Sequence, residues 1–153
     1  MNNNLDYDVG GSFSMGKAGL AEGTNAATLK TTNALNFCLK GIAYAKAATD
    51  NIAMTALDQQ ADLTSCLYTV GINASGTVKV FKGVEQLTTE VDKGDVPLYW
   101  PRVDSGYVAI GGFRIVLDGG TFTSGTTDLS GTGVTDTYYD FAFMPSEPIV
   151  SST

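Results

Sequence analysis

The stretch "CLYTVGINASGTVKVFKG" (residues 66–83) gives the clearest indication of how this chain folds. Its first part places apolar residues at every second position, and a later part resumes the same alternation: Cys66, Tyr68, Val70, Ile72, then Val78 and Val80. Between the two parts, residues 73–76 are rich in turn-forming types. A period of two broken by a short polar loop predicts an antiparallel β-hairpin with one buried face.

A second hairpin is predicted upstream in "LNFCLKGIAY" (residues 35–44), where apolar residues again alternate with polar or small ones. The pair Lys40-Gly41 interrupts the alternation and places glycine where a tight turn requires positive φ. Residues 53–61 differ, because Ala53, Leu57 and Ala61 keep a four-residue spacing. That spacing predicts one or two helical turns.

The C-terminal half predicts further strands. Phe113, Ile115 and Leu117 share one face of a strand, and the preceding pair Gly111-Gly112 indicates a β-bulge or the close approach of another segment. Residues 92–95 form a predicted turn, and a Gly/Thr/Ser-rich loop follows at residues 118–135. A last strand is predicted in "DTYYDFAF" (residues 136–143), with its aromatic residues 139, 141 and 143 on one side.

We therefore expect an all-β or mainly β fold, a small antiparallel β-sandwich or barrel-like domain with an extended N-terminal arm. The expected organisation is an arm at residues 1–23, a β-rich domain at 24–145 and a C-terminal tail at 146–153. The arm carries apolar residues in near alternation: Leu5, Tyr7, Val9, Phe13 and Met15. An isolated arm cannot bury these side chains, so docking across the domain or onto a neighbouring subunit is preferred to disorder.

Composition and charge exclude several functions. The chain has 153 residues, a formal net charge of -7 and no histidine, so a basic nucleic-acid interface and histidine-based catalysis or metal ligation are disfavoured. No apolar stretch approaches the ~20 residues of a membrane span, and the N-terminus lacks the pattern of a secretory signal. We expect cytoplasmic synthesis, with Cys38 and Cys66 reduced rather than joined in a disulfide.

Two groups of residues were weighed as sites for chemistry. "GGSFSMGKAG" (residues 10–19) contains Gly11, Gly16 and Lys17 at phosphate-loop spacing, but Ala18 replaces the hydroxyl that would hold Mg²⁺ and no strand–helix context surrounds it. The clustered carboxylates are expected to be solvated surface charges: Glu85, Glu90, Asp92, Asp95, and the pair Asp58 and Asp62. No catalytic residues, cofactor or metal are predicted, and an enzyme is the least favoured class.

The aromatic pair Tyr99-Trp100 stands between Pro97 and Pro101, and the two prolines exclude a central strand there. Tyrosine and tryptophan are frequent anchors of protein interfaces and also form stacking platforms for carbohydrates. A structural alternative is that Trp100 covers the open end of the sandwich. The residue types alone leave these alternatives open.

Two stretches of the chain resemble small structural proteins of tailed bacteriophages. The first has a Thr-Asn lead, F-x-x-x-G-x-x-Y and A-T-D-N, carried by Thr32, Asn33, Phe37, Gly41, Tyr44, Ala48, Thr49, Asp50 and Asn51. The second has prolines before G-x-V-x-I-G and then a Gly/Thr-rich loop, carried by Pro97, Pro101, Gly106, Val108, Ile110, Gly111, Phe122, Gly125, Thr126, Thr127 and Leu129. The larger residues of "VPLYWP" depart from that pattern.

The resemblance implies a virion component, a capsid decoration (cement) protein that binds the major capsid protein, commonly as a trimer. On this hypothesis the protein interface consists of the five apolar arm residues and of the loop residues Pro97, Tyr99, Trp100 and Pro101. The alternative is a fibre, spike or baseplate module that contacts host surfaces or glycans through Tyr99 and Trp100.

Overall fold

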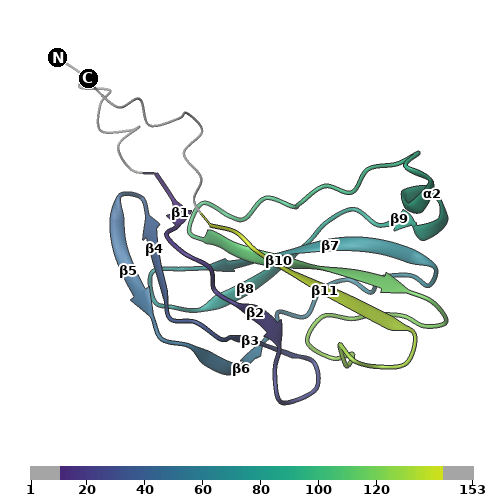
Figure 1. Ribbon diagram of the computed structural model, residues 1–153, viewed down its shortest axis with the longest axis horizontal. Coiled ribbons are helices and arrows are strands. Elements are labelled where there is room, and N and C mark those ends of the chain that lie inside the picture. The colour runs from purple at the N-terminus through teal and green to yellow at the C-terminus, as the bar shows by residue number, and fades with distance from the viewer. Residues whose placement is uncertain (1–10, 143–153) are drawn as a thin grey trace.

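The fold is mainly β, as expected, with antiparallel sheets packed against one another in a small sandwich (Figure 1). The computed structural model describes residues 11–142. The larger sheet has the strand order β11-β10-β7-β8, and β9 also pairs with β7. Its strands are β7 (Thr64–Ile72), β8 (Val78–Lys82), β9 (Gln86–Leu87), β10 (Val108–Leu117) and β11 (Val134–Asp140).

The opposing layer consists of two small sheets with the orders β1-β4-β5 and β2-β3-β6. Their strands are β1 (Phe13–Ser14), β2 (Leu20–Glu22), β3 (Thr28–Thr31), β4 (Leu35–Leu39), β5 (Ile42–Lys46) and β6 (Thr49–Ala53). The hairpin β4–β5 confirms the prediction at residues 35–44. Lys40 and Gly41 have φ values of 51° and 80°, as a two-residue turn with two left-handed positions requires.

The hairpin β7–β8 confirms the prediction from residues 66–83, with Tyr68 opposite Lys82 and Ile72 opposite Val78. The Asn73 side-chain oxygen accepts hydrogen bonds from the backbone N–H groups of Ser75 and Thr77, which fixes the turn. The alternate apolar residues of β7 point into the core, where the Tyr68 ring stacks on Phe113 at 5.0 Å between centroids.

Strand β7 is buried along all nine of its residues, so both faces of the sheet are covered there. The outer cover is residues 97–107, which we call the proline strap, running back over the large sheet from the end that carries the short helix α2 (Thr88–Lys93) (Figure 1). The Thr69 hydroxyl donates a hydrogen bond to the Pro101 carbonyl at 2.8 Å and ties the strap to β7.

The bulge or close approach expected at Gly111-Gly112 is confirmed in both respects. The β10–β7 register shifts between Ala109 and Gly111. A Cβ at Gly111 would collide with Leu20 of β2, and one at Gly112 would collide with the Trp100 ring. Glycine is therefore required on both faces of β10 at this point.

The helical turns predicted at residues 53–61 are wrong. Strand β6 ends at Ala53, and Gln60 then forms an isolated antiparallel bridge with Phe122. The Gln60 side chain is fully buried, and its Nε2 donates to the carbonyls of Thr64 and Ile115. These tertiary hydrogen bonds override a weak local periodicity.

Helix α2 falls where only a turn at residues 92–95 was expected. Its six residues precede Gly94, which has a φ of 79° and ends the helix in the left-handed conformation. The Gly94 and Asp95 N–H groups donate to the Val91 and Glu90 carbonyls. The glycine signal belonged to a helix C-terminus rather than to an isolated turn.

Part of the predicted arm is incorporated into the sheets. Strand β1 pairs with β4, and β2 pairs with β3. The Leu20 N–H also donates a hydrogen bond to the Asp140 carboxylate at 3.1 Å. Residues 13–22 thus belong to the folded domain, because each of these short strands finds an edge with which to pair. Residues 1–10, with Leu5, Tyr7 and Val9, lie outside the described residues, as do Phe143 and the tail at 146–153.

Candidate interaction surface

Glycines in the large sheet allow the proline strap to lie directly on it. A Cβ at Gly83 would lie 3.1 Å from the Tyr99 carbonyl oxygen, and one at Gly71 would lie 3.2 Å from side-chain atoms of Val103 and Tyr107. Side chains at these positions would lift the strap from the sheet. The positions of Tyr99 and Trp100 therefore depend on residues of β7 and on the turn after β8.

Trp100 packs on the outer face of β10, above Gly112. The Trp100 ring contacts the rings of Tyr139 and Phe141 in edge-to-face geometry, with 5.4 Å and 4.9 Å between the ring centroids. We call Trp100, Tyr139 and Phe141 the aromatic cluster. Edge-to-face contacts at these distances are favourable beyond the area they bury.

The aromatic cluster is only partly covered. Trp100 is 37% exposed, Tyr139 is 42% exposed, and the neighbouring Tyr99 is 75% exposed. Trp100 therefore covers part of a sheet and also leaves apolar surface accessible. The use of this surface as an interface anchor or carbohydrate platform stays a prediction. The covered surface is the outer face of β10, rather than the open end of the sandwich.

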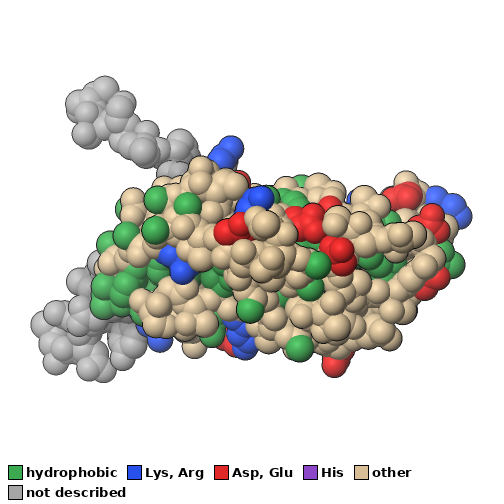
Figure 2. Space-filling model, turned by 90° about the horizontal axis from the view of Figure 1, so that it is seen from below, with side chains coloured by type: hydrophobic (Ala, Val, Ile, Leu, Met, Phe, Trp, Pro, Cys, Tyr) green, Lys and Arg blue, Asp and Glu red, His purple; other side chains and the backbone are tan. Residues whose placement is uncertain are grey.

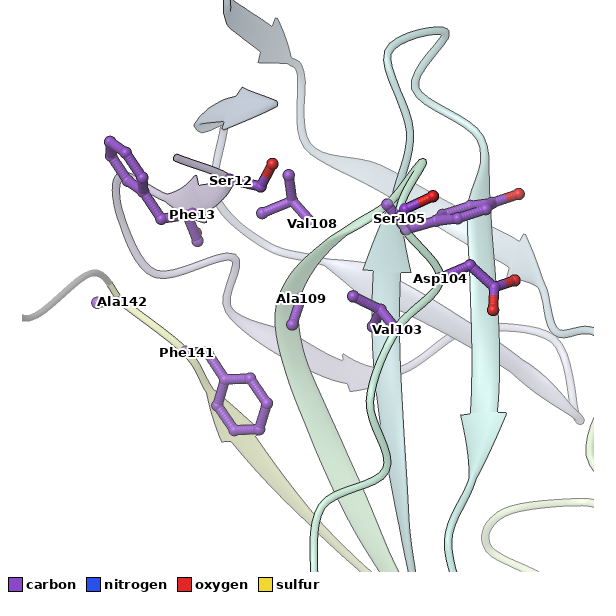
Figure 3. A pocket seen from close by; sticks show the side chains of 11 residues that line it. Ser12, Phe13, Val103, Asp104, Ser105, Val108, Ala109, Phe141 and Ala142 are labelled. Atoms are coloured by element: carbon purple, nitrogen blue, oxygen red, sulfur yellow. The ribbon is translucent and has the colours of Figure 1, made fainter. Parts of the chain in front are cut away.

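A pocket of about 450 Å³ adjoins the aromatic cluster (Figure 3). It is lined from β1, the strap, the start of β10 and the chain after β11, with Phe141 shared between the pocket and the cluster. The lining residues are Ser12, Phe13, Ser14, Val103, Asp104, Ser105, Tyr107, Val108, Ala109, Phe141 and Ala142. The pocket thus brings together residues that lie far apart in the sequence, 12–14 and 141–142.

A cation–π group supports the strap where it forms the pocket wall. Lys79 pairs with Asp104 at 2.7 Å, and its ammonium lies 4.8 Å from the Phe81 ring centroid and 5.7 Å from that of Tyr107. The hydrogen bond and charge of Asp104 raise the pKa of Lys79. Lys79 therefore remains charged and holds the strap at this edge.

The predicted interface residues are brought together in part. Phe13 lines the pocket, and Trp100 belongs to the adjoining cluster. Met15 is 55% exposed but does not line the pocket, and Pro97 is exposed on the strap. Pro101 is half-buried, with its carbonyl bonded to Thr69.

Sequence reasoning missed Tyr139 and Phe141 as members of this surface. It placed both correctly on one side of the last strand, but it did not connect that side with Trp100. The available signal was the alternation of aromatic residues in this last segment. A glycine on the neighbouring strand leaves space beside an aromatic side chain, and another aromatic ring can fill that space. Gly112 pairs with Tyr139 across β10 and β11.

Among the clustered carboxylates, Asp62 and Glu85 have clear structural partners. Asp62 accepts hydrogen bonds from the N–H groups of Leu63, Gly119 and Gly120, and these bonds hold its pKa below the ordinary value. Glu85 pairs with Lys82. Within residues 11–142 no group of three or more His, Cys, Asp or Glu residues could hold a metal ion.

The phosphate-loop-like stretch contains β1, and β2 rather than a helix follows Lys17. The Ser14 hydroxyl donates to the Gly16 carbonyl, so this loop has its own internal bond. The part of the chain that is described contains no helix long and apolar enough to cross a membrane. Both cysteines are free, with Cys66 buried and Cys38 half-buried.

Comparisons with protein-family models, with curated proteins and with solved structures find no match to this chain.

Proposed function

We propose that this protein is a structural component of a tailed-bacteriophage virion, a capsid decoration protein that binds the major capsid protein. One observation carries the proposal. Residues 12–14, the proline strap and residues 141–142 meet around one pocket, beside a partly exposed aromatic cluster. Surface of this kind, with tryptophan and tyrosine at its centre, is typical of protein interfaces.

The residues behind the phage resemblance have structural roles that fit a scaffold. Gly41, Asn51 and Gly125 adopt positive φ, while Phe122 and Leu129 are fully buried. The resemblance thus concerns turns and core, and it supports the fold more directly than the partner. The larger residues of the strap, where this chain departs from the pattern, are the ones that reach the surface.

The physical rationale is that decoration stabilises a shell by burying area across its subunit boundaries. A small sandwich gains such area by presenting a pocket flanked by the roots of two terminal segments. In the proposed arrangement, trimers sit on the capsid surface and the residues before β1 extend onto the capsid or a neighbouring subunit. Ordering such a segment on binding costs conformational entropy, and this cost offsets part of the free energy gained from the buried area.

The proposal is tested by adding the purified protein to capsids that lack it and measuring bound copies by co-sedimentation. Deletion of residues 1–10 leaves β1 intact and is expected to abolish binding at concentrations that saturate the full chain. Trp100→Ala is expected to weaken binding by about 2 kcal/mol, roughly 30-fold. Val84→Ala, at a 74% exposed position that does not line the pocket, is the control. Full occupancy by both test variants would contradict the proposal.

A second candidate function is glycan binding at a fibre, spike or baseplate. The observation that favours it is the combination of exposed Tyr99 and Trp100 with a pocket that also presents serine hydroxyls and the Asp104 carboxylate. Aromatic faces beside polar groups are a common arrangement for sugar rings. A glycan array probed with the full chain separates the candidates, since a decoration protein binds capsids and no glycan.

A further inference from the structure

A second hollow lies at the other end of β10. The strand starts at the first pocket, with Val108, and ends with Val116 and Leu117 in a groove of about 430 Å³. The groove is also lined by Leu63, before β7, and by Leu87 and Thr88, where β9 meets α2. We call it the α2 groove. None of its lining residues belongs to the aromatic cluster or to the first pocket.

The walls of the α2 groove expose aliphatic side chains. Leu63 is 57% exposed and Leu87 is 49% exposed. The two lie side by side, because the Thr88 N–H donates to the Leu63 carbonyl at 3.0 Å while Leu87 pairs with Thr64. Half-exposed leucines that share one groove form a continuous apolar surface, unlike leucines scattered over a protein.

Leu63 also occupies an unfavourable backbone conformation. Its φ is 58°, in the left-handed region where glycine or asparagine is less costly than leucine by about 1–2 kcal/mol. The Asp62 carboxylate, bonded to the N–H groups of Leu63, Gly119 and Gly120, fixes this backbone. An exposed leucine here gains little for the isolated domain, whereas a bound partner would bury it.

Acidic residues line the α2 groove or neighbour its lining residues in the sequence. Asp118 lines it, Asp62 precedes Leu63, and α2, whose Thr88 and Thr89 line the groove, contains Glu90 and Asp92. Basic groups nearby are Lys93 of α2 and Arg114, and the Arg114 guanidinium lies 3.6 Å from Asp92 and bonds to Ser65. Acidic side chains also outnumber basic ones on the face of the molecule shown in Figure 2, which is seen from the side opposite to α2 in Figure 1.

The charge of the groove argues against the chain's own termini as its occupant. The segments outside the described residues carry Asp6, Asp8 and Glu147 and contain no lysine or arginine. Placing them in an acidic groove, in the same or a second copy, would bring like charges together. An occupant needs aliphatic side chains for the two leucines and positive charge for the rim.

We propose that the α2 groove binds a segment of another protein in which aliphatic side chains alternate with, or are flanked by, lysine or arginine. The aliphatic side chains bury Leu63 and Leu87, and the basic groups pair with Asp118 and the carboxylates of α2. This surface is separate from the one invoked for capsid binding, so either can fail without the other.

The test uses the full chain labelled with ¹⁵N and three short synthetic peptides: alternating lysine–leucine, alternating glutamate–leucine and alternating lysine–serine. The lysine–leucine peptide is expected to shift the amide signals of Leu63, Leu87 and Thr88. The other two peptides should bind at least about 10-fold more weakly, the factor that corresponds to about 1.4 kcal/mol. Equal binding of the glutamate–leucine peptide, or of the lysine–serine peptide, would overturn the proposal, as would no binding of the first.

Two variants locate the binding. Leu63→Asn keeps a residue that tolerates positive φ and removes the apolar side chain, so it should weaken binding about 10-fold without lowering Tm. Leu87→Ser should have the same effect on binding, and Val84→Ser, an exposed aliphatic position that does not line the groove, should have none. Sedimentation without peptide completes the test: a dimer of the native chain that Leu87→Ser abolishes would make a second copy the occupant and refute the proposal.

Discussion

The buried hydrogen-bond group around Gln60 makes a quantitative prediction about stability. Gln60 Nε2 donates to the carbonyls of Thr64 and Ile115 at 3.1 Å and 3.2 Å, and Gln60 Oε1 accepts from the Tyr68 hydroxyl at 2.9 Å. Gln60→Leu keeps the side-chain volume but leaves the Tyr68 hydroxyl without its Gln60 partner, which costs about 1–3 kcal/mol of stability. It also removes the two hydrogen bonds donated by Nε2, each worth about 0.5–1.5 kcal/mol. We expect a total loss of about 2–6 kcal/mol in the free energy of unfolding.

The companion variant Tyr68→Phe retains the ring stacked on Phe113 and should cost about 1–2 kcal/mol. In the double variant no hydroxyl remains to lose its partner, so its cost should fall below the sum of the single costs by about 1 kcal/mol. Urea denaturation measures all three, and an unchanged m-value shows that the midpoints report stability. Costs that add within about 0.3–0.5 kcal/mol would refute the hydroxyl–amide bond and the account of why residues 53–61 are not helical.

Three further predictions follow from local geometry. Gly112→Ala should destabilise by about 1–3 kcal/mol in urea titrations, because the new Cβ would collide with Trp100 and lie 2.5 Å from the Tyr68 carbonyl oxygen, whereas Gly106→Ala, with open space around it, should be neutral. The pKa of Asp62 is lowered by its three backbone hydrogen bonds, so its stabilising effect is complete above about pH 4 and is lost as pH falls through its folded-state pKa. Asp62→Asn should therefore show a shallower loss of stability on acidification than the native chain. Burial, the largest effect, raises the pKa of Cys66 to about 11, so a thiol reagent at neutral pH should label Cys66 only after unfolding, and rapid labelling in the native state would contradict this.

The elements that were predicted correctly are those determined by neighbours in the sequence. Both hairpins follow from alternation and from a turn whose residues suit its backbone, as Lys40-Gly41 shows with two positive φ values. The glycine pair of β10 was recognised because a strand interior rarely tolerates two glycines without a bulge or a close neighbour. In both hairpins the signal and its structural cause lie within a few residues of each other, whereas the glycine pair is a local signal of distant neighbours, Leu20 and Trp100.

The failures occur where distant segments meet. Residues 53–61 carry a helix-like spacing, but the Gln60 side chain finds carbonyls on β7 and β10 that no local pattern reveals. The aromatic cluster likewise joins the strap to β11, and the sequence named Trp100 without its partners. The α2 groove was missed because Leu63 and Leu87 become neighbours only when β9 pairs with β7.

The position of the candidate interaction surface follows from the large sheet rather than from the strap's own sequence. No residue of the strap belongs to a β-strand, so its position depends on the sheet that lies beneath it. The strap lies close to the sheet because no side chain is present at Gly71, Gly83 and Gly112. The Thr69 hydroxyl donates the hydrogen bond that anchors the strap at Pro101. The strap buries the outer face of β7 and also places Trp100 beside Phe141, so covering the sheet and presenting the aromatic cluster go together. Stability and the proposed binding surface are therefore coupled through Trp100, while Tyr99, which is mostly exposed, is free to serve a partner alone.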